Sequence, residues 1–339
     1  MGVLLEQSNT ATVSNPSRLV FLSGGDIESL DVAPADVISV VEAAFKCKTE
    51  GRAEIPPKPT IHPRPDCFLR ALPGYLESPD VAGLKWTSAY PSNRQAGLPT
   101  VGALVILNNP QTGLPLAILE GSRITAWRTA GVSAMATRLL ARDGASVLAI
   151  CGAGVQGDVH LEFLVHALPG LKEARVYDTD WEVVNRFLDR HGPRHPQLSL
   201  QAAASPRSAV RDADVIITAA PMREKPLAIL TADELAPGVL CLPIDLDSYF
   251  GPSAFAACQL FFSDDANQLL ALQEQGRFAA LPHIDGDYGH LLAGKVQGRS
   301  YPGERIMAIS VGVALGDLAV AHLLYRKAGD CGKGQLLEL

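Results

Sequence analysis

The segment that most constrains the fold runs from residue 147 to 178 and reads VLAICGAGVQGDVHLEFLVHALPGLKEARVYD. An apolar run leads directly into the glycine pattern GAGVQG, and a helical pattern of apolar residues follows as far as Pro169. A second apolar run ends at Asp178, twenty-one residues after Gly157. Strand, glycine turn, helix, strand and carboxylate, in this order, are typical of a dinucleotide-binding βαβ unit.

Each glycine of this pattern has a physical reason. Gly152 permits the tight turn after the strand, Gly154 lets the backbone approach a pyrophosphate, and Gly157 lets the helix pack closely on the strand. The helix that begins near Val155 and Gln156 offers free N–H groups and the positive end of its dipole to phosphates. A glycine turn of purely structural use is the alternative, but it would not require the rest of the pattern.

The carboxylate at Asp178 favours NAD as the cofactor. At the end of the second strand it can accept both ribose hydroxyls of the adenosine, and it would repel a 2′-phosphate. The next residues, Thr179 and Asp180, add no cation that could offset this repulsion. A carboxylate here could instead cap the following helix, and we assign that role to Asp180.

Composition excludes several classes of function. A net charge of −7 gives no basic surface for nucleic acid or for an anionic membrane. No apolar run approaches the roughly 20 residues needed to span a bilayer. The six cysteines are scattered without a CxxC pair, and the eight histidines form no HExxH motif. We therefore expect a cytoplasmic protein without a bound metal.

Strands and helices are distributed unevenly along the chain. The first part of the chain has a helix from Pro34 to about Glu50, and its strand-like runs then follow one another without helices, which predicts an antiparallel or mixed sheet. These runs cover residues 67–72, 81–89, 101–107 and 114–120. From Thr125 a helix is expected, and afterwards strands alternate with helices as in a doubly wound parallel sheet. The expected strands there cover residues 146–151, 174–178, 198–202, 215–220, 238–244 and 259–263.

This order predicts an α/β protein in which a doubly wound Rossmann domain is inserted into a discontinuous α+β domain. We place the NAD-binding domain at residues 129–305. Residues 1–128 and 306–339 form the second domain.

Long cations interrupt the apolar strands of the first domain. In residues 81–89, alternation sets Leu84 and Trp86 on one face and Lys85 on the other. Arg70 interrupts CFLRALP, Arg128 lies in the first turn of the helix expected from Thr125, and Lys58 lies in a proline-rich stretch. Each could singly be a solvated side chain. Several together, opposite a nucleotide domain, indicate a site for a carboxylate-bearing substrate.

Two carboxylates, Asp245 and Asp247, follow the expected strand 238–244. The carboxyl ends of parallel strands are where such sheets bind ligands. A carboxylate there could take and return a proton beside a nicotinamide ring. For Asp245, a helix cap or a ribose contact is the competing interpretation.

Three stretches together resemble the ornithine cyclodeaminase/μ-crystallin family. They are GAGVQG, the preceding RTAGVSAMATRLLAR, and KWTSAYPSNRQAGLPTVGALVILNNPQTGLPLAILE. The likeness runs from about Lys58 to the C-terminal helix. It implies a dimer whose discontinuous N-terminal domain binds substrate and forms the interface, and a Rossmann domain that holds NAD or NADP.

The resemblance also implies roles for single residues. Lys85 would hold an amino-acid carboxylate, Lys58 would assist it, and Asp247 would be the catalytic aspartate, with Asp245 as the second candidate. Asp317 would correspond to an acidic residue of the last helix. Positions that would line the cofactor or lie near the nicotinamide and the substrate are Thr100, Arg128, Thr129, Thr218, Ser310, Val311 and Gly312.

Two departures from the family pattern concern the substrate. Ornithine cyclodeaminases carry a glutamate close to where Arg70 stands, and a guanidinium there would repel the cationic side chain of ornithine. They also continue past the aspartate with a Pro-Gly-Lys-x-Glu-like segment, where this chain reads SYFGP. We therefore predict an NAD-dependent oxidoreductase acting on the C–N bond of a small amino or imino acid with a neutral or acidic side chain. Cyclodeamination and a non-enzymatic, μ-crystallin-like ligand-binding role are the alternatives.

Overall fold

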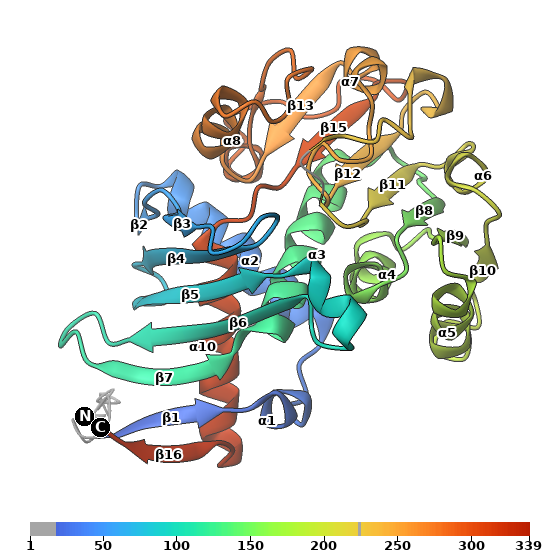
Figure 1. Ribbon diagram of the computed structural model, residues 1–339. Coiled ribbons are helices and arrows are strands. Elements are labelled where there is room, and N and C mark those ends of the chain that lie inside the picture. The colour runs from blue at the N-terminus through green and yellow to red at the C-terminus, as the bar shows by residue number, and fades with distance from the viewer. Residues whose placement is uncertain (1–17, 223–224) are drawn as a thin grey trace, which may run out of the picture.

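A computed structural model describes residues 18–222 and 225–339, which form two β-sheets with helices packed between and around them (Figure 1). The first sheet has the strand order β16-β1-β7-β6-β5-β4-β2, and β3 pairs with β4. Its strands are β1 (Arg18–Leu22), β2 (Ala53–Glu54), β3 (Thr60–Ile61), β4 (Phe68–Leu76), β5 (Val81–Ala89), β6 (Val101–Asn108), β7 (Pro115–Glu120) and β16 (Gln335–Glu338).

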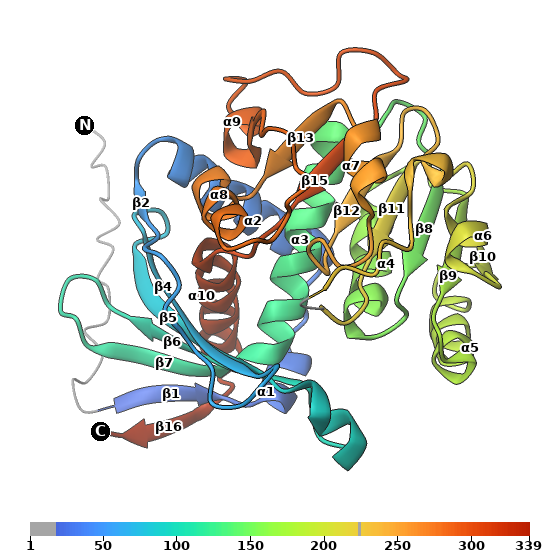
Figure 2. The ribbon, with the colours of Figure 1, turned by 45° about the horizontal axis from the view of Figure 1, so that its top comes forward.

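This first sheet is mixed, as predicted, because β1 runs parallel to β7 whereas its other strand pairs are antiparallel. Helices α2 (Pro34–Thr49), α3 (Gly121–Leu140) and α10 (Ala314–Cys331) cover one of its faces (Figure 2). Lys85 on β5 is 1% exposed and Trp86 is 38% exposed. The predicted alternation therefore turns the lysine toward the helices and the tryptophan away from them.

The second sheet is parallel throughout and has the order β10-β9-β8-β11-β12-β15-β13-β14. Its strands are β8 (Val147–Cys151), β9 (Glu173–Tyr177), β10 (Ser199–Ala202), β11 (Val215–Thr218), β12 (Leu240–Pro243), β13 (Leu260–Ser263), β14 (Gly286–Asp287) and β15 (Ile306–Ile309). From β8 the strand order runs in two directions, because β9 and β10 lie on one side of β8 and β11 and β12 lie on the other. The glycine turn follows β8, so it lies at the switch point where such sheets bind ligands.

The helices of the second half alternate with these strands, as the sequence pattern predicts. They are α4 (Val155–Ala167), α5 (Trp181–His191), α6 (Pro206–Val210), η2 (Ala232–Glu234), α7 (Pro252–Ala257), α8 (Ala266–Glu274) and α9 (Tyr288–Leu292). The first half also contains α1 (Gly24–Glu28) and the 3₁₀ helix η1 (Pro91–Ala96). None of the helices in residues 18–222 and 225–339 is long and apolar enough to cross a membrane.

Two predicted boundaries need correction. Helix α3 begins at Gly121, because the Glu120 side chain accepts hydrogen bonds from the backbone N–H groups of Ser122 and Arg123. Arg128 therefore lies about two turns into the helix, not in its first turn. The predicted division at 305/306 places β15 with the first domain, whereas in the structure β15 pairs with β12 and β13 of the parallel sheet. The chain thus returns to the first sheet only after Ile309.

Candidate active site

The glycine turn after β8 is built for close approach. Gly152 has a φ of +114°, and a Cβ there would lie 2.6 Å from the carbonyl oxygen of Ala219. A Cβ on Gly157 would lie 2.0 Å from the carbonyl oxygen of Gly152. A Cβ on Gly154 would meet nothing within 4 Å, so the turn is open on that side. These surroundings agree with the predicted uses of the three glycines.

The residues around this turn fit a dinucleotide. Helix α4 begins at Val155, which is 71% exposed, and its first N–H groups are available to an anion. Asp178 accepts a hydrogen bond from the backbone N–H of Ala153 at 2.9 Å, which holds its carboxylate beside the turn. Asp180 caps α5 by accepting from the N–H of Glu182 at 3.0 Å, which confirms the predicted cap.

Gln156 contacts a buried histidine through its backbone carbonyl. Its backbone carbonyl contacts the ring of the buried His160 at 2.7 Å, and its side-chain oxygen has no hydrogen-bond partner among the described residues. Burial lowers the pKa of His160 to about 4, so this ring is neutral.

On the first sheet, Lys85 forms a buried cluster with Arg128 and Asp317. The Lys85 ammonium lies 2.8 Å from Asp317 Oδ1 and 3.3 Å from Thr125 Oγ1. Arg128 Nε donates to the same Asp317 oxygen at 3.1 Å. Burial, together with the neighbouring Arg128 charge, lowers the pKa of Lys85 to about 8. One carboxylate is therefore shared by two cations.

Lys58 lies over the turn that leads from β15 into α10. Its ammonium donates to the carbonyl oxygens of Val311 and Gly312, both at 2.9 Å. Burial is the main cause that lowers the pKa of Lys58 to about 8, and the charges of Arg70 and Arg128 add to the effect. Lys58 and Arg128, far apart in sequence, thus meet at residues 310–313, and their roles toward a substrate stay predictions.

Asp264 is a site residue that the sequence reasoning missed. Its two carboxylate oxygens accept hydrogen bonds from the backbone N–H groups of Val311 and Gly312, both at 2.8 Å. Burial raises its pKa. A signal was present, because Asp264 and Asp265 directly follow the strand β13, and Asp245 likewise lies just after the end of β12. Next to them, Ser310 Oγ lies 3.3 Å from the Tyr288 hydroxyl.

The two candidate catalytic aspartates have different surroundings. Asp245 accepts from Thr218 Oγ1 at 2.8 Å and from the N–H of Ala220 at 3.1 Å, at the carboxyl ends of β11 and β12. Burial raises its pKa to about 7. Asp247 forms an ion pair with Arg277 and accepts from the backbone N–H of Phe278 at 2.7 Å.

Arg70, Thr100 and Thr129 complete the predicted set. Arg70 lies on β4, where its Nε donates to Thr60 Oγ1 at 2.9 Å. Thr129 is buried and its hydroxyl donates to the carbonyl of Thr125 within α3. Thr100 is exposed just before β6, and its carbonyl accepts from the N–H of Tyr90. No described contact joins Thr100 or Thr129 to the glycine turn, and their cofactor roles stay predictions.

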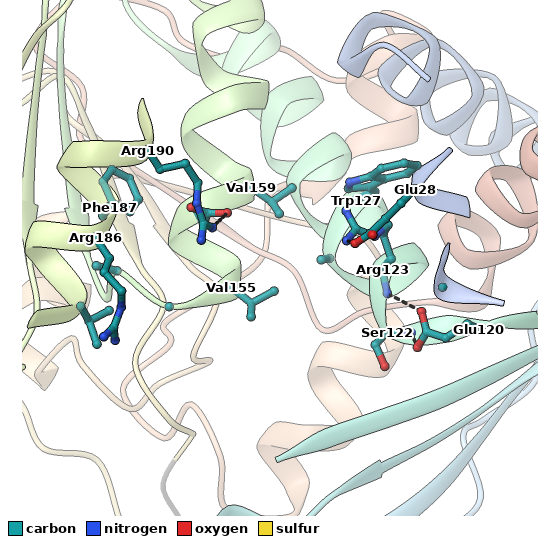
Figure 3. Close-up of a pocket in the computed structure, with 16 residues that line it drawn as sticks. Glu28, Glu120, Ser122, Arg123, Trp127, Val155, Val159, Arg186, Phe187 and Arg190 are labelled. Atoms are coloured by element: carbon teal, nitrogen blue, oxygen red, sulfur yellow. Dashed lines mark hydrogen bonds and ion pairs between the residues drawn. The ribbon is translucent and has the colours of Figure 1, made fainter. Parts of the chain in front are cut away.

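A cavity of about 540 Å³ borders the glycine turn between the two halves of the molecule (Figure 3). One wall comes from α4 and α5 and carries Val155, Val159 and Phe187; the facing wall includes Trp127 and Glu120. The lining also includes Ala153 and Gly154. The cavity therefore opens a path to the turn from the side of α3.

Beyond the cavity wall, Glu162, His191 and His195 place possible ligand atoms within 4.8 Å of one another. His191 contacts Asp158 through Nε2 at 2.8 Å and Glu162 through Nδ1 at 3.1 Å. These contacts explain the cluster as an ion-pair network between α4 and α5. The predicted absence of a metal stays a prediction.

Comparisons with known proteins show the family of the chain. The chain is 30% identical to the nodulation efficiency protein NfeD of Rhizobium meliloti, over 94% of this chain and 98% of the relative. Among solved structures, it is similar to Δ1-pyrroline-2-carboxylate reductase of Thermococcus litoralis in complex with NADH and L-proline, with a TM-score of 0.84 and 29% identity over 94% of this chain and 99% of that one. An archaeal alanine dehydrogenase dimer with bound NAD also has a TM-score of 0.84, with 28% identity and the same coverage of both chains. A model of the ornithine cyclodeaminase/mu-crystallin family matches residues 19–332, and the chain therefore belongs to that family.

Proposed function

We propose that the protein is an NAD-dependent oxidoreductase that acts on the C–N bond of a small amino or imino acid. The observation that carries this proposal is the meeting of Lys58 and Arg128 at residues 310–313, directly after a strand of the cofactor sheet. A carboxylate held there lies at the edge where the parallel sheet binds its cofactor. The similar reductase and dehydrogenase described above, which bind NADH and NAD, support the same chemistry.

Different residues of the chain would bind the cofactor and the substrate. The turn 152–157 and Asp178 would hold the dinucleotide, which when bound supplies or accepts the hydride at its nicotinamide. Lys58, Lys85 and Arg128 would hold the substrate carboxylate and so fix Cα for transfer. In the reductive direction an imine, a hydride and a proton give an amine, and the oxidative direction releases the same hydride and proton.

The proton requires an acid–base group, and we assign it to Asp245 rather than to Asp247, the first choice from the sequence. Asp247 is held by an ion pair with Arg277 and by a hydrogen bond from the backbone N–H of Phe278, so the protein itself already occupies its carboxylate. Asp245 has a pKa of about 7, close to the value that is best for both accepting and donating a proton. Thr218 orients it by a hydrogen bond.

The test is NADH oxidation with a panel of cyclic imines and of 2-oxo acids plus amines. We expect turnover with at least one class, and Asp245→Asn should lower kcat about 100-fold or more while leaving NADH binding nearly unchanged. Imine reduction needs the protonated acid, so its rate should fall as pH rises through about 7, and amine oxidation should show the opposite dependence.

Asp247→Asn is the matched control, because it removes a neighbouring carboxylate that we place outside the chemistry. Normal activity of Asp245→Asn with loss of activity in Asp247→Asn would reverse the assignment. Silence across the whole panel despite tight NADH binding would favour a ligand-binding role, and turnover of ornithine to proline would favour cyclodeamination.

We further propose that the protein is a homodimer formed through the uncovered face of the first sheet. Trp86 on β5 lies directly opposite Leu104 on β6 in the strand register, and they are 38% and 44% exposed. Neighbouring exposed apolar side chains of this size are typical of an interaction surface. The similar alanine dehydrogenase is a dimer. A cytoplasmic location stays a prediction.

A further inference from the structure

We infer that the substrate is a dicarboxylic amino or imino acid and that Arg70 binds its second carboxylate. The inference rests on the proposed function, because it concerns the same site. It is carried by the position of Arg70, by the contacts that leave part of its guanidinium free, and by the balance of charge around it.

Strand register places Arg70 beside the carboxylate-binding cations. In the β4–β5 pair, Arg70 lies opposite Thr87, and Leu72 lies opposite Lys85. Side chains two residues apart on a strand share a face, and so do directly opposed residues. Arg70 therefore points to the same face as the buried Lys85. The charge of Arg70 also contributes to the lowered pKa of Lys58, which places the two cations near each other.

Two contacts orient the guanidinium of Arg70, and only its Nε donates a hydrogen bond to another described residue. Its Nε donates to Thr60 Oγ1 at 2.9 Å, and its Cζ lies 4.5 Å from the centre of the Phe68 ring. These contacts fix the plane of the group from one edge and one face. Among residues 18–222 and 225–339, nothing accepts a hydrogen bond from Nη1 or Nη2. Two parallel N–H groups of this kind match the two oxygens of a carboxylate.

The site also carries an excess of positive charge, which favours an anionic ligand. Four cations, Lys58, Arg70, Lys85 and Arg128, meet two carboxylates, Asp317 and Asp264, because the third nearby carboxylate, Asp265, is paired with Lys48. Within the described part of the chain, neither Lys58 nor Arg70 forms an ion pair with a carboxylate. Burying a cation without a partner is costly, and burial lowers the pKa of Arg70. A substrate with one carboxylate would offset part of this surplus, and a dicarboxylate would offset it fully.

The experiment compares matched acids that differ by one carboxylate. NADH oxidation is measured with oxaloacetate against pyruvate, and with 2-oxoglutarate against 2-oxobutyrate, each with ammonium. We expect kcat/KM for the dicarboxylic member to be at least tenfold higher. Arg70→Met should lower that value about 100-fold and so remove the preference over the monocarboxylic member. Arg64→Met is the control, because Arg64 is exposed and contacts only its own loop.

A preference for the monocarboxylic acids, or an unchanged ratio in Arg70→Met, would overturn the inference and leave the proposed function intact. Calorimetric binding of succinate and of butyrate to the NADH complex separates the two kinds of failure. Absence of turnover with Arg70-dependent succinate binding would overturn the proposed function but not the dicarboxylate site. Equal binding of succinate and butyrate to wild type and to Arg70→Met would overturn the dicarboxylate site itself.

Discussion

Gly154 and Gly157 lie three residues apart in one turn, yet an added methyl group would meet different surroundings at each. At Gly157 it would collide with the Gly152 carbonyl, and at Gly154 it would meet open space. We expect Gly157→Ala to lower the free energy of unfolding by about 1–3 kcal/mol or more, because backbone must move. Gly154→Ala should keep wild-type stability but weaken NADH binding about tenfold, since the methyl group occupies the path of the pyrophosphate.

Urea denaturation and NADH fluorescence titration measure the two effects separately. Equal loss of stability in both variants would contradict the different surroundings of the two glycines. Unchanged NADH affinity in Gly154→Ala would contradict the assignment of the open side of the turn to the cofactor.

At the residue scale, side-chain direction could be predicted where a strand is regular and not where the chain turns. Alternation along β5 correctly separates Lys85 from Trp86. After β12 the same rule fails, because Leu246 adopts a φ of +61° between Asp245 and Asp247. A left-handed residue redirects the chain, so spacing alone could not say which of the two aspartates faces Thr218. Asp264 was missed because its partners are backbone amides of a distant turn.

At the scale of elements, His191 joins the end of α5 to α4 through two carboxylates, Asp158 and Glu162. These hydrogen bonds raise the pKa of His191 despite its burial. A histidine with a raised pKa stabilises the fold fully below its unfolded pKa of about 6.5, and this stabilisation is lost as pH rises through the folded pKa. Both carboxylates have lowered pKa values and stay ionised over this range.

We therefore expect His191→Gln to reduce the free energy of unfolding by about 1–3 kcal/mol at pH 5.5, and by less at pH 8.5. His166→Gln, on the exposed side of α4, is the control and should have little effect at either pH. Chemical denaturation at the two pH values checks this. A deficit in His191→Gln that grows with pH would show that His191 acts as a neutral packing residue.

Elements with local signals could be predicted, and those that depend on distant partners could not. The strand–turn–helix of residues 147–167 follows from periodicity and glycine spacing alone. The sequence analysis missed strands β1 and β16, because both are short and depend on distant partners: β16 pairs with β1 across more than 300 residues of chain, and β1 also pairs with β7. The start of α3 was placed four residues late, since its cap is a glutamate rather than the more usual serine, threonine or aspartate.

At the scale of the whole molecule, the uncovered face of the first sheet is where we propose the dimer interface. We expect Trp86→Glu combined with Leu104→Lys to convert the dimer into a monomer, because charged groups would have to be buried in the interface. Light scattering after size exclusion measures the mass, and Leu336→Lys, on the exposed edge strand β16, is the control. A wild-type monomer, or a double variant that stays dimeric, would contradict this interface.

The insertion of the parallel sheet between two parts of the first unit could be predicted from the order of patterns along the chain. The residue at which the chain returns to the first sheet could not be predicted. Strand β15 lies between β12 and β13 in the parallel sheet, and such pairing does not follow from local propensity. The division at residues 128/129 also falls inside α3, a single helix that both sheets share. The division into two folding units therefore stays a prediction.

The turn at residues 310–313 is bound from both sides. Asp264, at the end of β13, holds its amides, and Lys58, beside the first sheet, holds its carbonyls. A shift of the parallel sheet would therefore reach Lys58, the cation that we propose to hold the substrate carboxylate. Binding of NADH and of the acid would then be thermodynamically linked, and any factor by which NADH changes the affinity for the acid would equal the factor by which the acid changes the affinity for NADH.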